Sequence, residues 1–442
     1  MSSICKKAKK ALRAAIQETE QRKAQFLRCP DKDFTRNRKL PFSRMLRIMI
    51  GLAGGSLTNE LMDFFHCSPQ MASSSAFIQQ RAKIKPEALE FLFHQFTDRI
   101  SSNNLYRGYR LLAVDGSDIQ TATDPNDSDA YYPGANGQKP YNLHHLNALY
   151  DLLGRFYVDM LIQKSKNQYE RGALTQMIDR SAISKAIVMA DRGYESYNVM
   201  AHIQEKGWFY LIRIKDGKKG IKSGLILPKA DEFDFFVDLQ LSRKQTSEAA
   251  ALYLLKNQYR FIPTNVVFDY LPVKHTKYEP MRCYHLPFRI VRFLLPSGDY
   301  ETVVTNLPAR DFPPDELKKL YAMRWGIETS FRELKYTVGL LHFHAKKAEY
   351  IYQEIFASLV MYNFTELITA QVVTHSKSRK YAYMADFSVA VHACRQFLQG
   401  NVSPPSVEAL ISRNLSPVRP GRNSPRKMTH IKTSFSFLYR VA

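Results

Sequence analysis

Apolar residues in the first hundred positions recur at helical spacing, so the chain up to about residue 105 is predicted to be helical. Pro41 begins an apolar helix, Ser56 can cap a second over 57–66, and a short break leads into a third over 70–84. The last two are typical of a helix-turn-helix, although an ordinary helical hairpin explains them equally well. Polar residues of the third helix are suitable for contacts to phosphates and base edges: Gln70, Ser73, Ser74, Gln79, Gln80, Arg81 and Lys83.

Two short apolar runs farther along the chain each end in an aspartate. Residues 110–114 (RLLAV) lead into Asp115, and residues 187–190 (IVMA) lead into Asp191. Each run is predicted to be a buried strand with a polar tip.

The elements around these strands predict a mixed sheet with helices on its faces. Alternating runs over 142–152 and 155–164 indicate a hairpin. Helices are expected over 167–180 and 196–206, and another strand over 208–214. The order strand, hairpin, helix, strand, helix, strand favours the α/β class.

The helical pattern fades between about 215 and 310, where alternating segments favour a β-rich insertion: Phe233–Leu241, Ala251–Leu255, Phe288–Leu295 and Tyr300–Thr305. A long helix follows Pro313-Pro314 and runs to about 336. Further helices are predicted over 346–373 and 385–399. The Pro-rich, basic tail is expected to be flexible.

The net charge of the chain indicates what kind of molecule it binds. Lys and Arg total 63 against 41 Asp and Glu, a formal net charge of +22. Such an excess favours a polyanion: nucleic acid first and an anionic membrane surface second, with a merely basic soluble protein as the alternative. No apolar run reaches the roughly 20 residues of a membrane span, and the N-terminus has no signal core. The five cysteines show no CxxC spacing, so we expect a cytoplasmic protein without a zinc or disulfide site.

Both aspartates follow predicted strands at their carboxyl ends, where open α/β sheets place ligand sites. Two neighbouring carboxylates there repel each other unless a metal lies between them, and oxygen ligands suit Mg²⁺ or Mn²⁺. Each aspartate alone is better explained as a turn-forming or capping residue. Asp115 is preferred to Asp118 because it directly follows the apolar run.

The predicted helix over 315–336 carries a polar edge beside its buried stripe. At about 100° per residue, one stripe is apolar: Leu320, Met323, Ile327, Phe331 and Leu334. A second cluster lies within about 60° along its edge: Tyr321, Arg324, Glu328 and Lys335. An i,i+4 ion pair worth about 0.3–0.5 kcal/mol would explain the arginine and the glutamate. The phenol and the amine on the same edge favour a functional site.

These residues suit the chemistry of phosphodiesters. Arg324 and Lys335 would offset phosphate charge, and Tyr321 would donate a hydrogen bond to the DNA backbone. Three carboxylates would hold two metal ions, one activating water or a 3′-hydroxyl and one stabilising the leaving oxygen: Asp115, Asp191 and Glu328.

The spacing of the polar edge resembles a known signature. Tyr-x₂-Arg-x₃-Glu-x₆-Lys over 321–335 matches that of the insertion-sequence-four family of bacterial transposases, which belongs with the DDE transposases. VDGSD at 114–118 and ADRGY at 190–194 resemble the family's first and second Asp motifs. The resemblance covers about 105–375, and more weakly the N-terminal helices and the tail.

The resemblance implies a ribonuclease-H-like (retroviral-integrase-like) core interrupted by a β-strand insertion. It also implies Mg²⁺-dependent DNA hydrolysis and strand transfer at terminal inverted repeats, with two ions per site that Mn²⁺ is expected to replace. A homodimer that pairs two double-stranded DNA ends in a synaptic complex, in a bacterial cytoplasm and associated with the nucleoid, is implied likewise.

Five regions follow from this reading of the chain. They are a helical N-terminal DNA-binding region (1–105), the first part of the catalytic core (106–214), the β-rich insertion (215–310), the second part of the core with the glutamate helix (311–375), and a helical C-terminal region with the basic tail (376–442).

One departure from the family concerns hairpin formation at the DNA end. Hairpin-forming relatives can stack a flipped base on a tryptophan of the insertion, whereas Trp208 and Trp325 both lie outside it. Either another aromatic residue such as Tyr253, Tyr259 or Phe261 serves, or the route differs.

Two alternatives to a transposase remain open. One is a metal-dependent nuclease on the same core without strand transfer, and the other is a non-catalytic DNA-binding regulator. The adjacent His144 and His145 point to opposite faces of a strand and are not expected to share a metal, and His342 with His344 is a weak zinc candidate.

Overall fold

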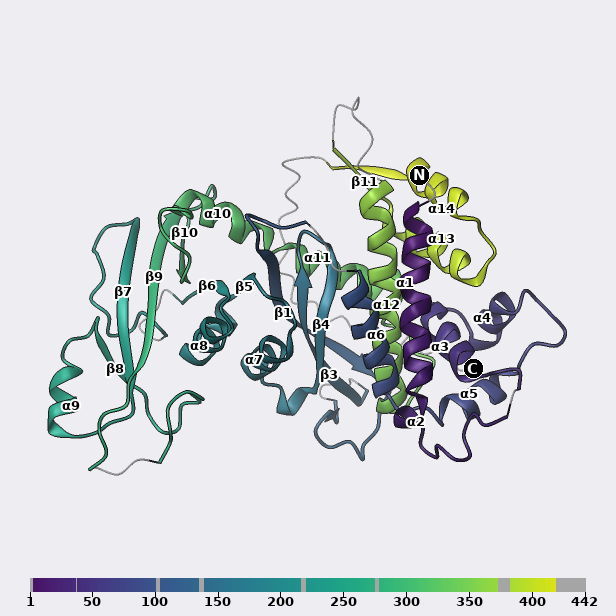
Figure 1. The fold of residues 1–442 in the computed structure, drawn as a ribbon, viewed down its shortest axis with the longest axis horizontal. Coiled ribbons are helices and arrows are strands. Elements are labelled where there is room, and N and C mark those ends of the chain that lie inside the picture. The colour runs from purple at the N-terminus through teal and green to yellow at the C-terminus, as the bar shows by residue number, and fades with distance from the viewer. Residues whose placement is uncertain are drawn as a thin grey trace.

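Helices occupy one side of the molecule and a long sheet extends away from them (Figure 1). The structure is a computed structural model that describes residues 3–36, 38–100, 104–134, 139–215, 220–274, 278–372 and 382–418. Most of the basic tail therefore lies outside the described residues. Within those ranges, no helix is long and apolar enough to cross a membrane.

The N-terminal region is helical, as predicted. Its helices are α1 (Ser3–Gln21), α2 (Lys23–Phe26), α3 (Phe42–Gly51), α4 (Leu57–Phe64), α5 (Ser74–Arg81) and α6 (Glu87–Arg99). Ser56 caps α4 by accepting a hydrogen bond from the Asn59 N–H, which confirms the predicted cap. Ser73 caps α5 in the same way, so α5 is shorter than the predicted helix over 70–84.

One ten-stranded mixed sheet forms the centre of the molecule, in the order β2-β3-β1-β5-β6-β10-β9-β7-β8, with β4 also paired to β3. Its first six strands are β1 (Arg110–Thr121), β2 (Tyr131–Tyr132), β3 (Tyr141–Asp151), β4 (Phe156–Lys164), β5 (Ala186–Ala190) and β6 (Phe209–Arg213). β5 lies parallel to both β1 and β6, whereas β3 is antiparallel to β1 and to β4. The predicted hairpin and the α/β class are thereby confirmed.

The β-rich stretch continues this sheet. Its strands are β7 (Phe233–Ser242), β8 (Tyr259–Phe261), β9 (Tyr284–Leu294) and β10 (Tyr300–Thr305). β10 pairs with β6 and β9 pairs with β10, so hydrogen bonds run without interruption from the central strands into the insertion. The strand predicted over Ala251–Leu255 is wrong, because a helix capped by Thr246, α9 (Ser247–Leu252), ends there and a turn follows it.

Helices cover both faces of the central strands. One face carries α7 (Glu170–Arg180) and α8 (Tyr197–Glu205), with 3₁₀ turns at Ser165–Asn167 and Arg192–Tyr194. The other carries α10 (Pro314–Met323), α11 (Gly326–Arg332), a π-helical turn (Glu333–Val338) and α12 (Ala348–Val372). The C-terminal elements are β11 (Ala382–Ala385), α13 (Phe387–Gln399), α14 (Pro404–Arg413) and β12 (Leu415–Val418). The green α12 and the purple α1 lie side by side in Figure 1 and contact each other.

Two predicted elements differ in shape from expectation. β1 does not end at Asp115 but continues beside β3 to Thr121. The single long helix is divided, because Arg324 and Trp325 form a turn between α10 and α11. Met323, at the end of α10, is 37% exposed and does not join the buried stripe.

Candidate active site

Strand register places the two aspartates opposite each other. β1 and β5 are parallel, and their last paired residues are Ala113 and Met189. Asp115 and Asp191 each lie two positions beyond that pair, where the strands have separated. Because side chains alternate along a strand, each aspartate points to the same face as the paired residue before it. Ala113 and Met189 belong to the hydrophobic clusters beneath α10 and α11, so both aspartates face those helices.

Glu328 approaches the aspartates from α11. Arg324, in the turn before that helix, lies between the acids: its guanidinium is 3.1 Å from a Glu328 oxygen and 3.8 Å from an Asp115 oxygen. The arginine side chain is 93% buried, and its Nε has no hydrogen-bond partner among the described residues. The i,i+4 ion pair considered from the sequence is therefore present, and the same arginine also reaches the β1 aspartate.

Asp191 begins the short 3₁₀ turn that follows β5. One of its oxygens accepts the Gly193 N–H at 2.8 Å, and Asp115 likewise accepts the Gly116 N–H at 2.9 Å. Each carboxylate is thus held by a glycine N–H just after it in the chain, which leaves its other oxygen for a different partner.

The acids form an electrostatically strained group. The pKa of Asp115 is raised to about 6, chiefly by burial and further by the nearby Asp191 and Glu328 carboxylates. The Gly116 N–H and Arg324 act in the opposite direction. A divalent cation would relieve this repulsion, and carboxylate oxygens are the ligands that Mg²⁺ prefers, so the donor set fits such an ion.

In this conformation the carboxylates of Asp115, Asp191 and Glu328 are not arranged as a complete set of metal ligands. Within the described ranges, no three Asp, Glu, His or Cys side chains are arranged to hold one ion. Arg324 occupies space between two of the acids instead.

The two remaining members of the signature contact backbone carbonyls around the acids. The Tyr321 hydroxyl donates to the Ala190 carbonyl at 3.4 Å, directly before Asp191. The Lys335 amine, carried by the π-helical turn, donates to the Asp118 carbonyl at 2.6 Å. Burial lowers the pKa of the Lys335 amine. The structure therefore brings all six predicted residues together around the point where β1 and β5 separate.

Comparison with known proteins places the chain in a family. A profile described as the transposase DDE domain matches residues 106–364, which is more than half of the chain. The chain belongs to the transposase DDE domain family. This confirms the DDE transposase predicted from the motifs.

Two bacterial relatives align over most of the transposase. The transposase for insertion sequence element IS231B of Bacillus thuringiensis subsp. berliner is 22% identical, over 74% of this chain and 72% of its own. Transposase InsG for insertion sequence element IS4 of Escherichia coli K12 is 22% identical, over 77% and 73%. They confirm the resemblance to the insertion-sequence-four family. Among solved structures, the piggyBac transposase synaptic complex with hairpin DNA aligns over 96% of this chain and 87% of that one, with 10% identity and a TM-score of 0.45.

Three polar residues beside the acids were not selected as site residues from the transposase sequence. His145 lies between two carboxylates: its Nδ1 is 2.6 Å from Asp118 and its Nε2 is 3.0 Å from Glu170. Glu170, at the start of α7, also lies beneath Gly116 and Gly193. It therefore lies close to both segments that carry the aspartates, the middle of β1 and the 3₁₀ turn after β5. These contacts could not be predicted from the sequence, because the spacing of residues does not reveal the register of β1 on β3 or the position of α7.

The Gly116→Ala substitution tests how tightly this group is packed. A β-carbon at residue 116 would come closer than 3.0 Å to His145 and to Glu170, so one of them must move. We expect a loss of roughly 1–3 kcal/mol in the free energy of unfolding, as for other overpacking substitutions, measured by urea denaturation. Gly51→Ala is the control, since its β-carbon would meet only ordinary contacts at 3.8 Å. Equal stability of both variants would contradict close packing at residue 116.

Other residues weighed from the sequence have structural partners in the transposase. Arg81 is buried and bonded to Gln353 and Glu354, so it is not available to DNA in this conformation. His344 lies 3.4 Å from Glu60 and 3.5 Å from Glu354 rather than in a zinc site with His342.

The aromatic residues considered for base stacking differ in their surroundings. Trp208 is 1% exposed and donates to the Ile183 carbonyl, so it cannot stack on a base. Trp325 is 52% exposed beside Arg324. In the insertion, the Tyr253 and Phe261 rings pack together at 5.7 Å.

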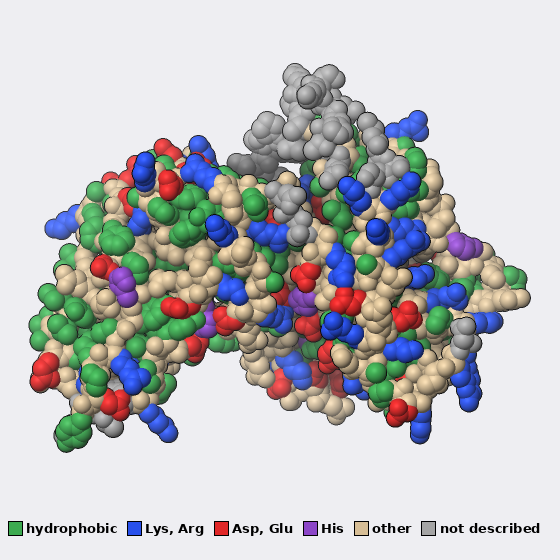
Figure 2. Space-filling view, viewed as in Figure 1, with side chains coloured by type: hydrophobic (Ala, Val, Ile, Leu, Met, Phe, Trp, Pro, Cys, Tyr) green, Lys and Arg blue, Asp and Glu red, His purple; other side chains and the backbone are tan. Residues whose placement is uncertain are grey.

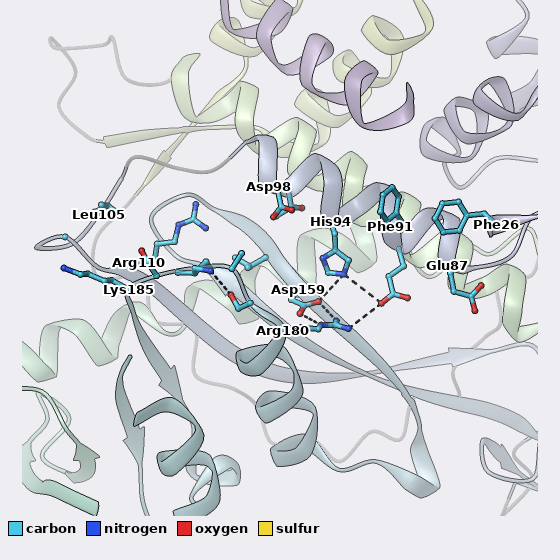
Figure 3. Close-up of a pocket in the computed structure, with 18 residues that line it drawn as sticks. Phe26, Glu87, Phe91, His94, Asp98, Leu105, Arg110, Asp159, Arg180 and Lys185 are labelled. Carbon is cyan, nitrogen blue, oxygen red and sulfur yellow. Dashed lines mark hydrogen bonds and ion pairs between the residues drawn. The ribbon is translucent and has the colours of Figure 1, made fainter. Parts of the chain in front are cut away.

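A cavity of about 830 Å³, shown in Figure 3, has none of the catalytic candidates in its lining. It is lined by Arg110 and Lys185, at or just before the starts of β1 and β5, and so lies at the opposite end of these strands from the aspartates. Asp159 within it contacts both His94 and Arg180. His94 and Arg180 thus both pair with Asp159, and none of the three belongs to the candidate active site.

Proposed function

We propose that the chain cleaves DNA at the terminal inverted repeats of an insertion sequence and joins the freed ends to a target. The catalytic acids in this proposal are Asp115, Asp191 and Glu328. The observation that carries it is the register of β1 and β5, which sets two aspartates on one face, with Glu328 and Asp115 both contacted by Arg324.

The three carboxylates would hold two Mg²⁺ ions, which Mn²⁺ is expected to replace. When bound, such ions activate an attacking hydroxyl and stabilise the leaving oxygen of a phosphodiester. Binding them would release Arg324 from Glu328 and Asp115, and its guanidinium would then be free to contact a phosphate. The pairing seen here therefore supports a resting state in which the arginine partly neutralises the acids.

Lys335 and Tyr321 would position DNA and the acidic loops. The Lys335 amine, about two helical turns beyond Glu328 and bonded to the Asp118 carbonyl, adds positive charge where a scissile phosphate would lie. Tyr321 is only 4% exposed and bonded to the end of β5, which supports a positioning role for its ring in addition to a hydrogen bond to DNA.

Strand order supports a ribonuclease-H-like core. β4, β3 and β1 form an antiparallel series, and β5 and β6 follow it parallel to β1. This is the arrangement of strands expected for that fold, with the β-rich insertion between its last strand and the glutamate helix. The net charge of +22 supports DNA as substrate, and a homodimer holding two DNA ends is part of the proposal.

Strand transfer can be tested with a labelled DNA end taken from the sequence that flanks this gene. The protein is incubated with Mn²⁺, the labelled end and a supercoiled plasmid, and joined product is followed on a gel. We expect cleaved ends and joined plasmid with the wild-type chain, and neither with Asp191→Asn or Glu328→Gln. Cleavage without joining would favour the nuclease. Unchanged processing by both variants would leave only a DNA-binding role.

A further inference from the structure

Three cations from two helices meet at a groove in the helical half of the molecule. Lys9 and Arg13 lie one turn apart on α1, and Arg47 comes from α3. The groove encloses a cavity of about 50 Å³, room for about four water-sized groups. Its remaining lining comes from α1, α3, α4 and α13: Leu12, Ile16, Ile50, Gly51, Phe64, Leu398 and Gln399. It lies in the helical half, whereas the candidate active site lies on the sheet.

These cations have no acidic partner to balance them. Across the ranges that the structure describes, no carboxylate lies within 4.0 Å of Lys9, Arg13 or Arg47. A like-charge pair one helical turn apart is destabilising, and a third cation adds to the repulsion. The pKa of the Lys9 amine is lowered, first by burial and then by the two arginines. A cluster of this kind costs free energy unless an anion joins it.

Only one of the three cations has an evident role in the fold. The Lys9 amine donates to the Phe397 carbonyl at 2.7 Å, in the last turn of α13, and lies 4.3 Å from the centre of that ring. It therefore ties α13 to α1 and satisfies a carbonyl at a helix end. Arg13 and Arg47 are exposed, and among the residues that the structure describes neither forms a hydrogen bond, ion pair or ring contact. Their positions call for a ligand from outside the chain.

We infer that this groove binds a phosphodiester of the DNA backbone, with Arg13 and Arg47 on the phosphate and the apolar lining beneath the neighbouring deoxyribose. DNA is chosen over other anions because a backbone offers both a charged oxygen pair and an apolar sugar, matching the two parts of the lining. Lys and Arg side chains are frequent over this half of the molecule in Figure 2.

This inference rests on the proposed function for DNA as the substrate, and it adds the place where DNA is held. Because α13 lines the groove together with α1 and α3, the DNA-contacting surface would combine the N-terminal and C-terminal regions. The predicted helix-turn-helix alone would not account for such a surface.

The test measures DNA affinity of the full chain without divalent metal, so that no cleavage interferes. Arg13→Gln and Arg47→Gln are combined, while Lys9 is left in place to hold α13. A short fluorescent duplex of fixed sequence is titrated between about 50 and 200 mM salt. We expect the dissociation constant to rise roughly tenfold, and the slope of log K against log salt to become shallower by about one, because contact to one phosphate is lost.

A charge-matched control separates this groove from the general positive charge. Arg22→Gln with Lys256→Gln removes two charges elsewhere, since Arg22 lies in the turn that follows α1, nine residues beyond Arg13, and Lys256 is in the insertion. We expect the control to change the slope by much less. Equal effects of the two double variants, or no effect of the groove variant, would overturn the inference.

Thermal melting distinguishes a binding role from a structural one. The groove variant removes repulsion, so its melting temperature should equal or exceed that of the wild type, whereas a structural role would lower it. If the groove substitutions weakened binding of an acidic peptide but not of DNA, the groove would be assigned to a protein partner. That result would overturn the inference. Failure here would leave the strand-transfer assay unaffected, because that assay depends on the acids rather than on this groove.

Discussion

Asp115→Asn is expected to lower DNA cleavage by roughly a thousandfold or more while leaving the metal-free protein as stable as the wild type or more stable. The amide keeps the shape of the carboxylate but cannot provide the charged oxygen that a divalent ion needs. Cleavage of a labelled end in Mg²⁺ and thermal melting without metal measure the two effects.

The sign of the stability change follows from the raised pKa of Asp115. Its value in the folded chain is about 6 against 3.8 for an ordinary Asp, so the folded state binds this proton more tightly than the unfolded state does. Stability is therefore lost as pH rises from about 3.8 through about 6, by up to about 3 kcal/mol. At pH 7 asparagine removes that penalty, and added Mg²⁺ should raise the melting temperature of the wild type but not of the variant. A variant that melts lower and still cleaves DNA would contradict the assignment.

Arg81→Met is expected to cost about 3–5 kcal/mol of stability without touching the acids. Arg81 and Glu354 form an ion pair at 2.6 Å whose side chains are 4% and 7% exposed, and the substitution leaves the glutamate buried without its main cation. The matched control is Arg28→Met, because Arg28 pairs with Glu349 on the same helix, α12, but at the surface. We expect the control to cost less than about 1 kcal/mol. Similar losses in the two variants, measured by urea denaturation, would show that burial of the Arg81 pair does not decide its strength.

The same network should make stability depend on pH. Burial lowers the pKa of His344, but Glu354 and Glu60 outweigh that effect and raise it to about 10. A raised histidine contributes stability that is complete below pH 6.5 and is lost as pH rises through about 10. The melting temperature should therefore fall between pH 6.5 and pH 10, and His344→Gln should flatten that fall.

Most of the architecture could be predicted because the spacing of hydrophobic residues within each central element indicates whether it is a helix or a strand. The alternating runs of the hairpin, the buried runs before each aspartate, the Ser56 cap and the helix start at Pro313-Pro314 are local signals, and the structure places elements at all of them. The strand prediction over Ala251–Leu255 failed because a short Ala- and Leu-rich segment fits either a strand or a helix, and the Thr246 cap favours the helix that ends there. The turn at Arg324 interrupts a helix whose apolar period is otherwise continuous, so periodicity alone could not reveal it.

The candidate site could be assembled from motifs, but not its surroundings. The spacing over 321–335 and the ends of two strands are enough to name six residues. The contacts of His145 and Glu170 depend on how β1 pairs with β3 across a long loop, which only three-dimensional structure supplies. The groove beside α1 could not be predicted from the sequence either, because its lining residues lie far apart in the chain.

The continuous strand pairing from β6 through β10, β9 and β7 limits how far the transposase could be shortened. Excising residues 215–310 would strip β6 of its antiparallel neighbour and leave a row of unsatisfied amides and carbonyls beside the catalytic strands. Such an edge invites aggregation, so a trimmed version would need a substitute strand or a covering helix, and natural shortening of this stretch would be limited in the same way.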